Sequence, residues 1–393
     1  MTIQLSNRVK AVKPSPTLAI TARAAEMRAA GKDIIGLGAG EPDFDTPDHI
    51  KAAAIDALNK GFTKYTAVDG IPSLKQAIID KFKRDNGFDY QLNQILVSCG
   101  GKQSFYNMAQ ALLNPGDEVI IPAPYWVSYP DMVLLAEATP VIVETTQAQH
   151  FKISPEQLRH AITDKTRLMV INSPSNPTGV AYSLDELKAL AEVLLDYPNI
   201  VIATDDMYEH ILWQKGRFVN ILNACPELYP RTMVLNGVSK AYSMTGWRIG
   251  YAGGPAEIIA AMRKIQSQST SNPTSISQVA AEAAITGDQR CIDDMMQEFK
   301  KRHDFVVEAL NKIDGIDCMA TDGTFYVFPN IQKALGNLSG IDSDLDFAEY
   351  LIEKAGVALV PGTAFGCPGH IRISIATSMD NLSNALERIR AAL

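Results

Sequence analysis

Short apolar runs alternate with amphipathic helical patterns from about Ile50 to Gly287, and this alternation restricts the folds that the chain can adopt. Several of the runs are apolar throughout, which is typical of strands buried on both faces. Strands separated by helices indicate an α/β fold, a mostly parallel sheet covered by helices on both sides. The candidate strands are Ile95–Cys99, Glu118–Ile121, Leu168–Ile171, Asn199–Thr204, Thr232–Asn236 and Arg248–Ala252.

A second, smaller α+β domain is predicted after this region, where a long helical pattern around Ile292–Ile313 leads into shorter elements. We expect an N-terminal arm at residues 1–45 that is part of the small domain, a large domain at 46–288 and a small C-terminal domain at 289–393. Prolines in and next to the arm are expected to break any long element. These are Pro14, Pro16, Pro42 and Pro47, and the predicted elements of the small domain are strands at Thr324–Phe328, Val357–Val360 and Ile371–Ile375 and helices near Asp344–Glu353 and Met379–Ala392.

Composition excludes several classes of protein. Thirty-six basic residues stand against 44 acidic ones, a net charge of −8 without any basic run, which argues against a general nucleic-acid binder. The five cysteines are widely separated and the six histidines show no metal-ligand spacing, so we predict neither a disulfide framework nor a metal site. The amino terminus lacks the apolar core of a signal peptide, and no run is long enough to span a membrane. We therefore expect a cytoplasmic protein without a membrane or nucleic-acid partner.

One lysine, Lys240, lies in a loop of small and hydroxyl residues within Asn236–Gly250. Taken alone, a lysine in such a loop is usually a solvated side chain. A lysine that attacks an aldehyde must be neutral, and burial beside a cation such as Arg248 lowers its pKa and favours that form. The surrounding motifs decide between the two interpretations.

The groups that could hold pyridoxal 5'-phosphate (PLP) around this lysine follow other predicted strands. The carboxyl ends of parallel strands meet at one edge of a sheet, so we expect these groups to lie close together. Asp205 is the candidate partner of the pyridine nitrogen, where a charge-assisted hydrogen bond is worth about 1.5–3 kcal/mol. Tyr208 and the amide of Asn176, in NPTG, could reach the phenolic oxygen of the cofactor.

Two anion sites are also predicted. Gly100-Gly101-Lys102 is a glycine turn into a helix, where N–H groups attract phosphate, although a plain strand-to-helix turn fits equally. Arg248 could add a bidentate phosphate contact. Arg372, in HIRIS, is either a solvated strand arginine or a guanidinium fork for a substrate α-carboxylate. Trp126 is either a core aromatic or a ring that stacks on the cofactor.

Taken in order, these motifs resemble those of the class I aminotransferases, which are fold-type I PLP enzymes. The likeness runs nearly end to end and is closest to the bacterial Ib subgroup of aspartate and aspartate/prephenate aminotransferases. It implies a seven-stranded, mostly parallel sheet in the large domain, PLP as cofactor, and a homodimer whose active sites are shared across the interface. The matching segments include GAGEPDFDTP (38–47), KYTAVDGIPSL (64–74), NSPSNPTG (172–179), DDMYEH (205–210), SKAYSMTGWRIGYA (239–252) and VPGTAFG (360–366).

The resemblance also implies a role for each candidate residue. Lys240 would form the Schiff base and carry the proton between the substrate α-carbon and the cofactor, with Asp205 and Tyr208 as the other catalytic residues. Lys102 and Thr17 would meet a distal carboxylate, and the absence of an arginine from Ser267–Ser275 supports the use of a lysine there. The other cofactor contacts would be Gly101, Lys102, Trp126, Asn176, Ser239, Arg248 and, from a neighbouring subunit, Tyr65; the other substrate contacts would be Gly40, Trp126, Asn176 and Arg372.

The implied reaction converts L-aspartate and 2-oxoglutarate to oxaloacetate and L-glutamate in two stages, with pyridoxamine phosphate between them and ping-pong kinetics. Prephenate or an aromatic amino acid is the nearest alternative substrate, and one enzyme could serve both aspartate and prephenate. A lyase of the same fold is a further alternative, as is a ligand-binding module without turnover. The joint retention of Lys240, Asp205 and Arg372 argues against the last of these.

Overall fold

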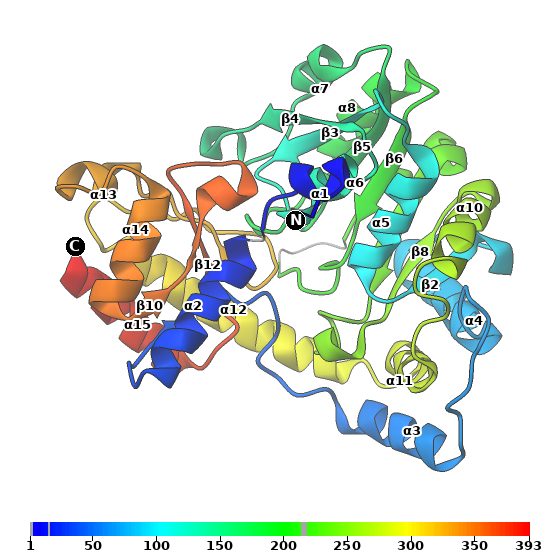
Figure 1. The fold of residues 1–393 in the computed structure, drawn as a ribbon, viewed down its shortest axis with the longest axis horizontal. Helices are drawn as coiled ribbons and strands as arrows, with labels where there is room; N and C mark the ends of the chain where they lie inside the picture. The colour runs from blue at the N-terminus through cyan, green and yellow to red at the C-terminus, as the bar shows by residue number, and fades with distance from the viewer. Residues whose placement is uncertain (1–2, 15, 214–217) are drawn as a thin grey trace.

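A seven-stranded sheet forms the centre of the larger part of the molecule (Figure 1). The computed structural model describes residues 3–14, 16–213 and 218–393. The strand order is β2-β8-β7-β6-β5-β3-β4, and β8 runs in the opposite direction to the other six strands. The prediction of a mostly parallel sheet is therefore confirmed. The strands are β2 (Ile95–Ser98), β3 (Glu118–Ala123), β4 (Thr139–Glu144), β5 (Thr166–Asn172), β6 (Val201–Asp205), β7 (Thr232–Gly237) and β8 (Gly250–Gly253).

Helices cover both faces of this sheet, as the apolar runs predict. Along β5, Leu168 and Val170 belong to one apolar core while Met169 and Ile171 belong to the other. The first core is closed by α5 (Gly101–Leu112), α6 (Ser128–Leu135) and α10 (Ala256–Ser267). The second is closed by α3 (Asp48–Asn59), α4 (Pro72–Lys81), α7 (Pro155–Ala161), α8 (Leu184–Leu195), α9 (Ile221–Ala224) and α11 (Ser275–Thr286).

Two features of the sheet differ from the expectation. Strand β4 was not among the candidate strands, because it lies at the edge of the sheet and its side chains are partly exposed, so its apolar signal is weak. The predicted strand Arg248–Ala252 starts too early, since β8 begins at Gly250. Arg248 has a φ of 57°, in the left-handed region, which no strand residue adopts.

The remaining elements form smaller sheets around a separate apolar core that includes Phe299, Phe325 and Phe347. Strand β1 pairs in parallel with β10, so the segment near Ile35 packs with the C-terminal part of the chain. The domain boundaries themselves stay a prediction. These elements are β1 (Ile35–Gly36), α12 (Arg290–Leu310), β9 (Tyr326–Val327), α13 (Gln332–Asn337), α14 (Asp344–Tyr350), β10 (Val357–Ala358), β11 (Val360–Pro361), β12 (Ile371–Ser374) and α15 (Met379–Ala392).

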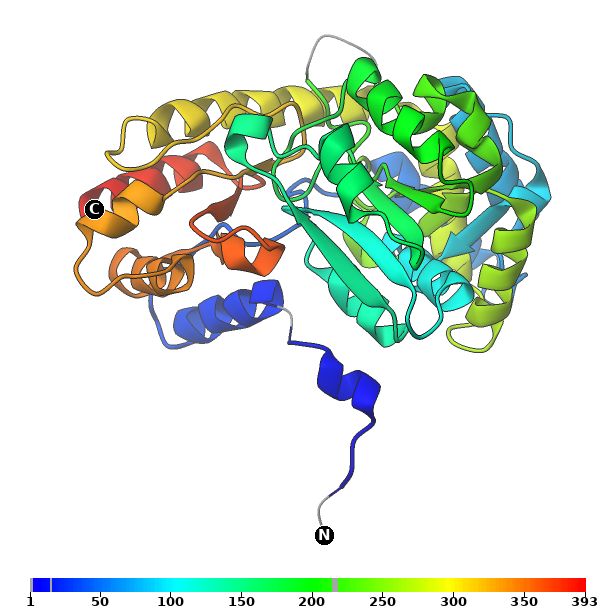
Figure 2. The ribbon, with the colours of Figure 1, turned by 90° about the horizontal axis from the view of Figure 1, so that it is seen from above.

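The N-terminal arm contains α1 (Asn7–Ala11) and a 14-residue helix, α2 (Pro16–Ala29). The expectation that prolines prevent any long element here is wrong. A proline suits the first position of a helix, where its missing N–H has no helical partner, so Pro16 begins a helix and does not break one. Figure 2 shows the chain before α1 projecting from one side of the molecule, while α1 itself lies beside α6. None of the helices in the described part of the chain is long and apolar enough to cross a membrane.

Candidate active site

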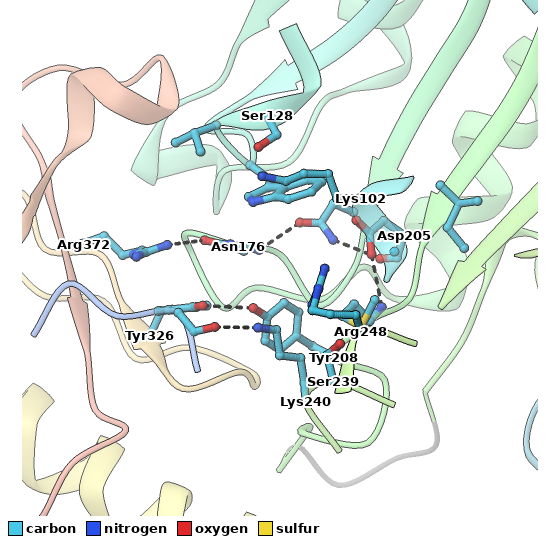
Figure 3. Close-up of a pocket in the computed structure, with 17 residues that line it drawn as sticks. Lys102, Ser128, Asn176, Asp205, Tyr208, Ser239, Lys240, Arg248, Tyr326 and Arg372 are labelled. Atoms are coloured by element: carbon cyan, nitrogen blue, oxygen red, sulfur yellow. Dashed lines mark hydrogen bonds between the residues drawn. The ribbon is translucent and has the colours of Figure 1, made fainter. Parts of the chain in front are cut away.

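A cavity of about 260 Å³ lies where the parallel strands end (Figure 3). Its walls combine residues from loops after β2, β3, β5, β6 and β7 with residues near the N-terminus and in β12. Most of the predicted site residues are therefore neighbours in space, although they span more than 300 positions in sequence. Those that line the cavity are Gly40, Gly101, Lys102, Trp126, Asn176, Asp205, Tyr208, Ser239, Lys240, Arg248 and Arg372.

The Lys240 side chain is only partly exposed and lines the cavity, so the interpretation of a solvated lysine is wrong. Its Nζ donates a hydrogen bond to the backbone oxygen of Gly40 at 2.5 Å. Burial lowers the pKa of Lys240 to about 8, against the attraction of Glu41, and the nearby guanidinium groups of Arg372 and Arg248 act in the same direction as burial. The neutral form of this amine is therefore much more populated near physiological pH than that of an ordinary lysine.

Asp205 ends β6, and its carboxylate is held by two donors. The hydroxyl of Tyr129 donates to Oδ2 at 2.5 Å, and the N–H of Met207 donates to Oδ1 at 3.3 Å. Burial raises the pKa of Asp205, whereas both hydrogen bonds and the charge of Lys240 oppose that rise. A cation placed against this carboxylate would favour its ionised form further.

Tyr208 lies across the cavity from Asp205 and pairs with a second tyrosine. The hydroxyl groups of Tyr208 and Tyr326 are 3.0 Å apart, and burial raises the pKa of Tyr208, with Tyr326 adding to the effect. Tyr208 is therefore neutral and can donate a hydrogen bond. A Cβ on Gly40 would meet the Tyr326 oxygen at 2.9 Å, so only glycine lets the two segments approach this closely.

Arg372 is buried, so the interpretation of a solvated strand arginine is wrong. Its Nη1 donates to Asn176 Oδ1 at 3.0 Å and its Nη2 donates to the backbone oxygen of Gly38 at 2.7 Å. The guanidinium carbon lies 4.4 Å from the centre of the Tyr326 ring. Its Nε is buried and has no hydrogen-bond partner among the described residues, which leaves a donor for a ligand.

The opposite wall carries positive charge and an aromatic ring. Gly101 begins α5, whose first N–H groups have no partner within the helix, and Arg248 lies beside this turn. Lys102 Nζ lies 5.2 Å from the centre of the Trp126 ring. Burial lowers the pKa of Lys102, and Arg248 lowers it further. This wall can bind an anion and can stack on a planar ring.

Two predicted residues are not among the described residues that line this cavity. The Tyr65 side chain is 92% exposed, in the loop between α3 and α4, so its predicted contact with a neighbouring subunit's cofactor stays a prediction. Thr17 lies in α2, but its side chain falls outside the described part of the structure, and its role also stays a prediction.

Sequence reasoning missed several residues that organise the site. Asn172 accepts from the N–H of Asn176 and donates to the backbone oxygen of Asp205, both at 2.9 Å, so it joins two cavity loops. Tyr129 and Tyr326 were also missed, although Tyr129 lies in the same motif as Trp126. An aromatic residue next to apolar ones is typical of a core position, and no local signal indicates its distant polar partner. Within the described ranges no cluster of metal-ligating side chains occurs.

Comparisons with known proteins agree along the whole chain. The family model for aminotransferases of class I and II matches residues 32–389. An aspartate/prephenate aminotransferase from Nitrosomonas europaea is 62% identical over 396 residues, covering 100% of both chains. The crystal structure of the aspartate aminotransferase from Rhizobium meliloti has a TM-score of 0.96 at 50% identity, over 100% of this chain and 99% of that one. The aspartate aminotransferase from Thermus thermophilus with maleate has a TM-score of 0.93 at 43% identity, over 100% of both chains.

Proposed function

Because the chain belongs to the class I and II aminotransferases, we propose that it converts L-aspartate and 2-oxoglutarate to oxaloacetate and L-glutamate. The relative from Nitrosomonas europaea is named for both aspartate and prephenate, which makes prephenate the second candidate substrate. The observation that carries the proposal is the buried amine of Lys240 in one cavity with Asp205 and Arg372.

Enzymes of this family use PLP, which when bound withdraws electrons from the carbon that carries the amino group. The residues of the cavity fit this cofactor. The start of α5 and Arg248 suit its phosphate, and the Asp205 carboxylate suits its ring nitrogen. A Cβ on Gly101 would meet the Met207 methyl carbon at 2.6 Å, so a larger residue there would have to displace the end of the Met207 side chain from the cavity wall.

Arg372 is proposed to bind the substrate α-carboxylate. Asn176 and Gly38 hold its guanidinium group in one orientation, which presets the fork for two parallel hydrogen bonds. Lys102 is proposed to meet the distal carboxylate of aspartate, with Thr17 beside it. The Thermus thermophilus relative has been solved with maleate, which is also a dicarboxylate.

Lys240 is proposed to hold the cofactor and then to move a proton at its Nζ. A pKa of about 8 suits both tasks, because the amine exists in neutral and protonated forms at the working pH. Tyr208 would donate its hydroxyl hydrogen to the phenolic oxygen of the cofactor. Trp126 would cover one face of the ring and exclude water from it.

The substrate assignment is tested by measuring initial rates for a matrix of donors and acceptors on the purified protein. The donors are aspartate, glutamate, arogenate and phenylalanine, and the acceptors are 2-oxoglutarate, oxaloacetate and prephenate. We expect a high rate for aspartate with 2-oxoglutarate. A prephenate rate that matches it would indicate a dual enzyme, and no turnover of aspartate would contradict the proposal.

The hydroxyl of Tyr129 is proposed to keep Asp205 in place for the cofactor. We expect Tyr129→Phe to weaken PLP binding at least about tenfold, because a hydrogen bond to a charged group is worth about 1.5–3 kcal/mol. Equilibrium dialysis of the cofactor measures this. Tyr182→Phe is the control, since the buried Tyr182 hydroxyl accepts only the Ile153 N–H, at 3.1 Å, away from the cavity. Equal weakening in both variants would contradict the assignment.

A homodimer is proposed because an apolar surface next to Tyr65 needs a cover. Ile55 and Leu58 in α3 and Phe62 after it are 59%, 52% and 38% exposed. Tyr65 would reach the phosphate in the partner subunit's site. Sedimentation velocity is expected to give a dimer, and a fully active monomer would contradict the proposal. A cytoplasmic location stays a prediction from the sequence.

A further inference from the structure

A buried ion pair beyond the cavity wall joins Lys81 to Glu209. Lys81 is the last residue of α4, and its side chain is 1% exposed. Glu209 directly follows Tyr208 in the loop after β6 and is also buried. Neither belongs to the described residues that line the cavity. Burying two charges in the interior is costly, so this pair calls for a physical reason.

Glu209 accepts hydrogen bonds from three side chains. Lys81 Nζ and Asn236 Nδ2 donate to its Oε1, the latter at 2.6 Å, and Asn86 Nδ2 donates to its Oε2 at 2.8 Å. Lys81 Nζ also donates to Asn86 Oδ1 at 2.9 Å. Burial by itself would raise the pKa of Glu209, but the charge of Lys81, with His210, lowers it to about 2. The carboxylate is therefore ionised and fully bonded.

One of the three donors of Glu209 lies on a strand that leads into a cavity loop. Asn236 is in β7, four residues before Lys240, and Asn86 ends the π-helical turn Phe82–Asn86 that follows α4. Glu209 itself is adjacent to Tyr208. One carboxylate thus joins the loop that carries the Tyr208 hydroxyl to the strand that leads to the Lys240 amine.

A second tether fixes the start of the same loop. Asp206 is buried, and its Oδ2 accepts from Asn220 Nδ2 at 2.7 Å. The same Nδ2 donates to Thr204 Oγ1 at 2.8 Å. Within this short loop, Asp205 and Tyr208 face the cavity, whereas Asp206 and Glu209 anchor in the interior. Two anchors interspersed among the cavity residues Asp205, Met207 and Tyr208 leave the loop little freedom.

We propose that Lys81, Glu209, Asn86 and Asn236 form a positioning network that holds Tyr208 and Lys240 at a fixed separation for PLP. The inference rests on the proposed function. Loss of the Lys81 charge leaves the buried Glu209 carboxylate with neutral amide donors and with His210, whose Nε2 lies 3.5 Å away, so the Glu209 side chain must move or neutralise. Because Tyr208 is the next residue, its hydroxyl moves with Glu209 and loses its alignment with the cofactor.

The test measures the dissociation constant for PLP and the visible circular dichroism of the bound cofactor, which reports how the ring is oriented. We expect Lys81→Met and Glu209→Gln to weaken PLP binding roughly ten- to hundredfold, the range found when groups that orient ligand-binding side chains are removed. Both should also reduce the visible circular dichroism. Asn236→Ser removes a neutral donor and unpairs no charge, so it should fold and weaken binding by a smaller factor.

Arg231→Met is the control for loss of stability alone. Arg231 lies directly before the amino-terminal end of β7, whereas the cavity lies at the carboxyl ends of the strands, and its guanidinium donates to the backbone oxygens of Leu194, Tyr197 and Ile200 at 2.6–3.1 Å. This variant should lower the urea midpoint of unfolding and leave PLP binding and the circular dichroism unchanged.

Two results would overturn the inference. One is unchanged PLP binding in the network variants that fold. If Lys81→Met does not fold, unchanged PLP binding in Asn236→Ser overturns the inference. The other is that Arg231→Met weakens PLP binding as much as a network variant that loses the same stability. The unsubstituted protein tests the proposed function separately, because it must bind PLP whatever the network does.

Discussion

Lys240→Ala is expected to abolish transamination while the protein stays folded. Without the amine at this position, the cavity loses the group proposed to hold the cofactor covalently and to move the proton at the substrate α-carbon, because the other cavity lysine, Lys102, lies over the Trp126 ring on the opposite wall. We expect kcat for aspartate and 2-oxoglutarate to fall on the order of ten thousandfold or more, as when other covalent catalytic residues are removed. Steady-state kinetics and far-ultraviolet circular dichroism on the same sample measure both parts of the prediction.

Stability gives an independent check on the environment of Lys240. Its pKa is about 8 in the folded chain against 10.5 for an ordinary lysine, so the unfolded chain binds more protons between these values. The stability that this group contributes to the PLP-free protein therefore rises with pH across this window and is lowest below pH 8. The free energy of unfolding of Lys240→Ala, measured relative to that of the unsubstituted protein, should be highest near pH 7. This difference should fall as the pH rises from 8 to 10.5.

A lysine outside the cavity provides the control. Lys152 pairs with Glu186 at 2.8 Å on the surface of the large sheet's helical layer, so Lys152→Ala should leave kcat unchanged. Substantial turnover by Lys240→Ala, at a rate near that of Lys152→Ala, would show that another amine carries the chemistry.

Arg372→Lys is expected to impair substrate capture more than any later step. The guanidinium fork has its orientation fixed by Asn176 and Gly38, and a lysine can supply only a point charge there. Loss of one charge-assisted hydrogen bond to the α-carboxylate is worth about 1.5–3 kcal/mol, which corresponds to roughly a ten- to hundredfold rise in KM. Kinetics with aspartate as the varied substrate measure kcat and KM separately.

Arg231→Lys is the matched control, because Arg231 also donates to backbone oxygens but lies at the amino-terminal end of β7, away from the cavity. It should change stability and leave KM unchanged. An unaltered KM in Arg372→Lys would mean that the α-carboxylate is bound elsewhere.

Much of the fold could be predicted from local patterns. Runs that are apolar throughout, such as Leu168–Ile171, must lie between two helical layers, and the structure divides their side chains between two cores. Strand β4 was not predicted, because it lies at the edge of the sheet and its side chains are only partly buried. The start of β8 was misjudged because Arg248 is the left-handed C-cap of the short 3-10 helix Thr245–Trp247, a turn that the apolar pattern does not reveal.

The candidate site could be predicted where a residue type already carries the chemistry, as for Lys240 and Asp205. The residues that were missed act through partners far away in sequence. Tyr129 meets Asp205 across 76 positions and Lys81 meets Glu209 across 128, and nothing near either residue indicates these pairings. The contribution of Tyr65 depends on a second copy of the chain, so its role needs measurement on the assembled protein.

The central claim is that Nζ of Lys240 becomes covalently joined to PLP. Reduction of the PLP-loaded protein with borohydride, followed by digestion and mass spectrometry, tests it most directly. The account predicts a single stable modification of the mass of reduced PLP, located on Lys240. A modification on another lysine, or none at all in a protein that catalyses transamination, would contradict it.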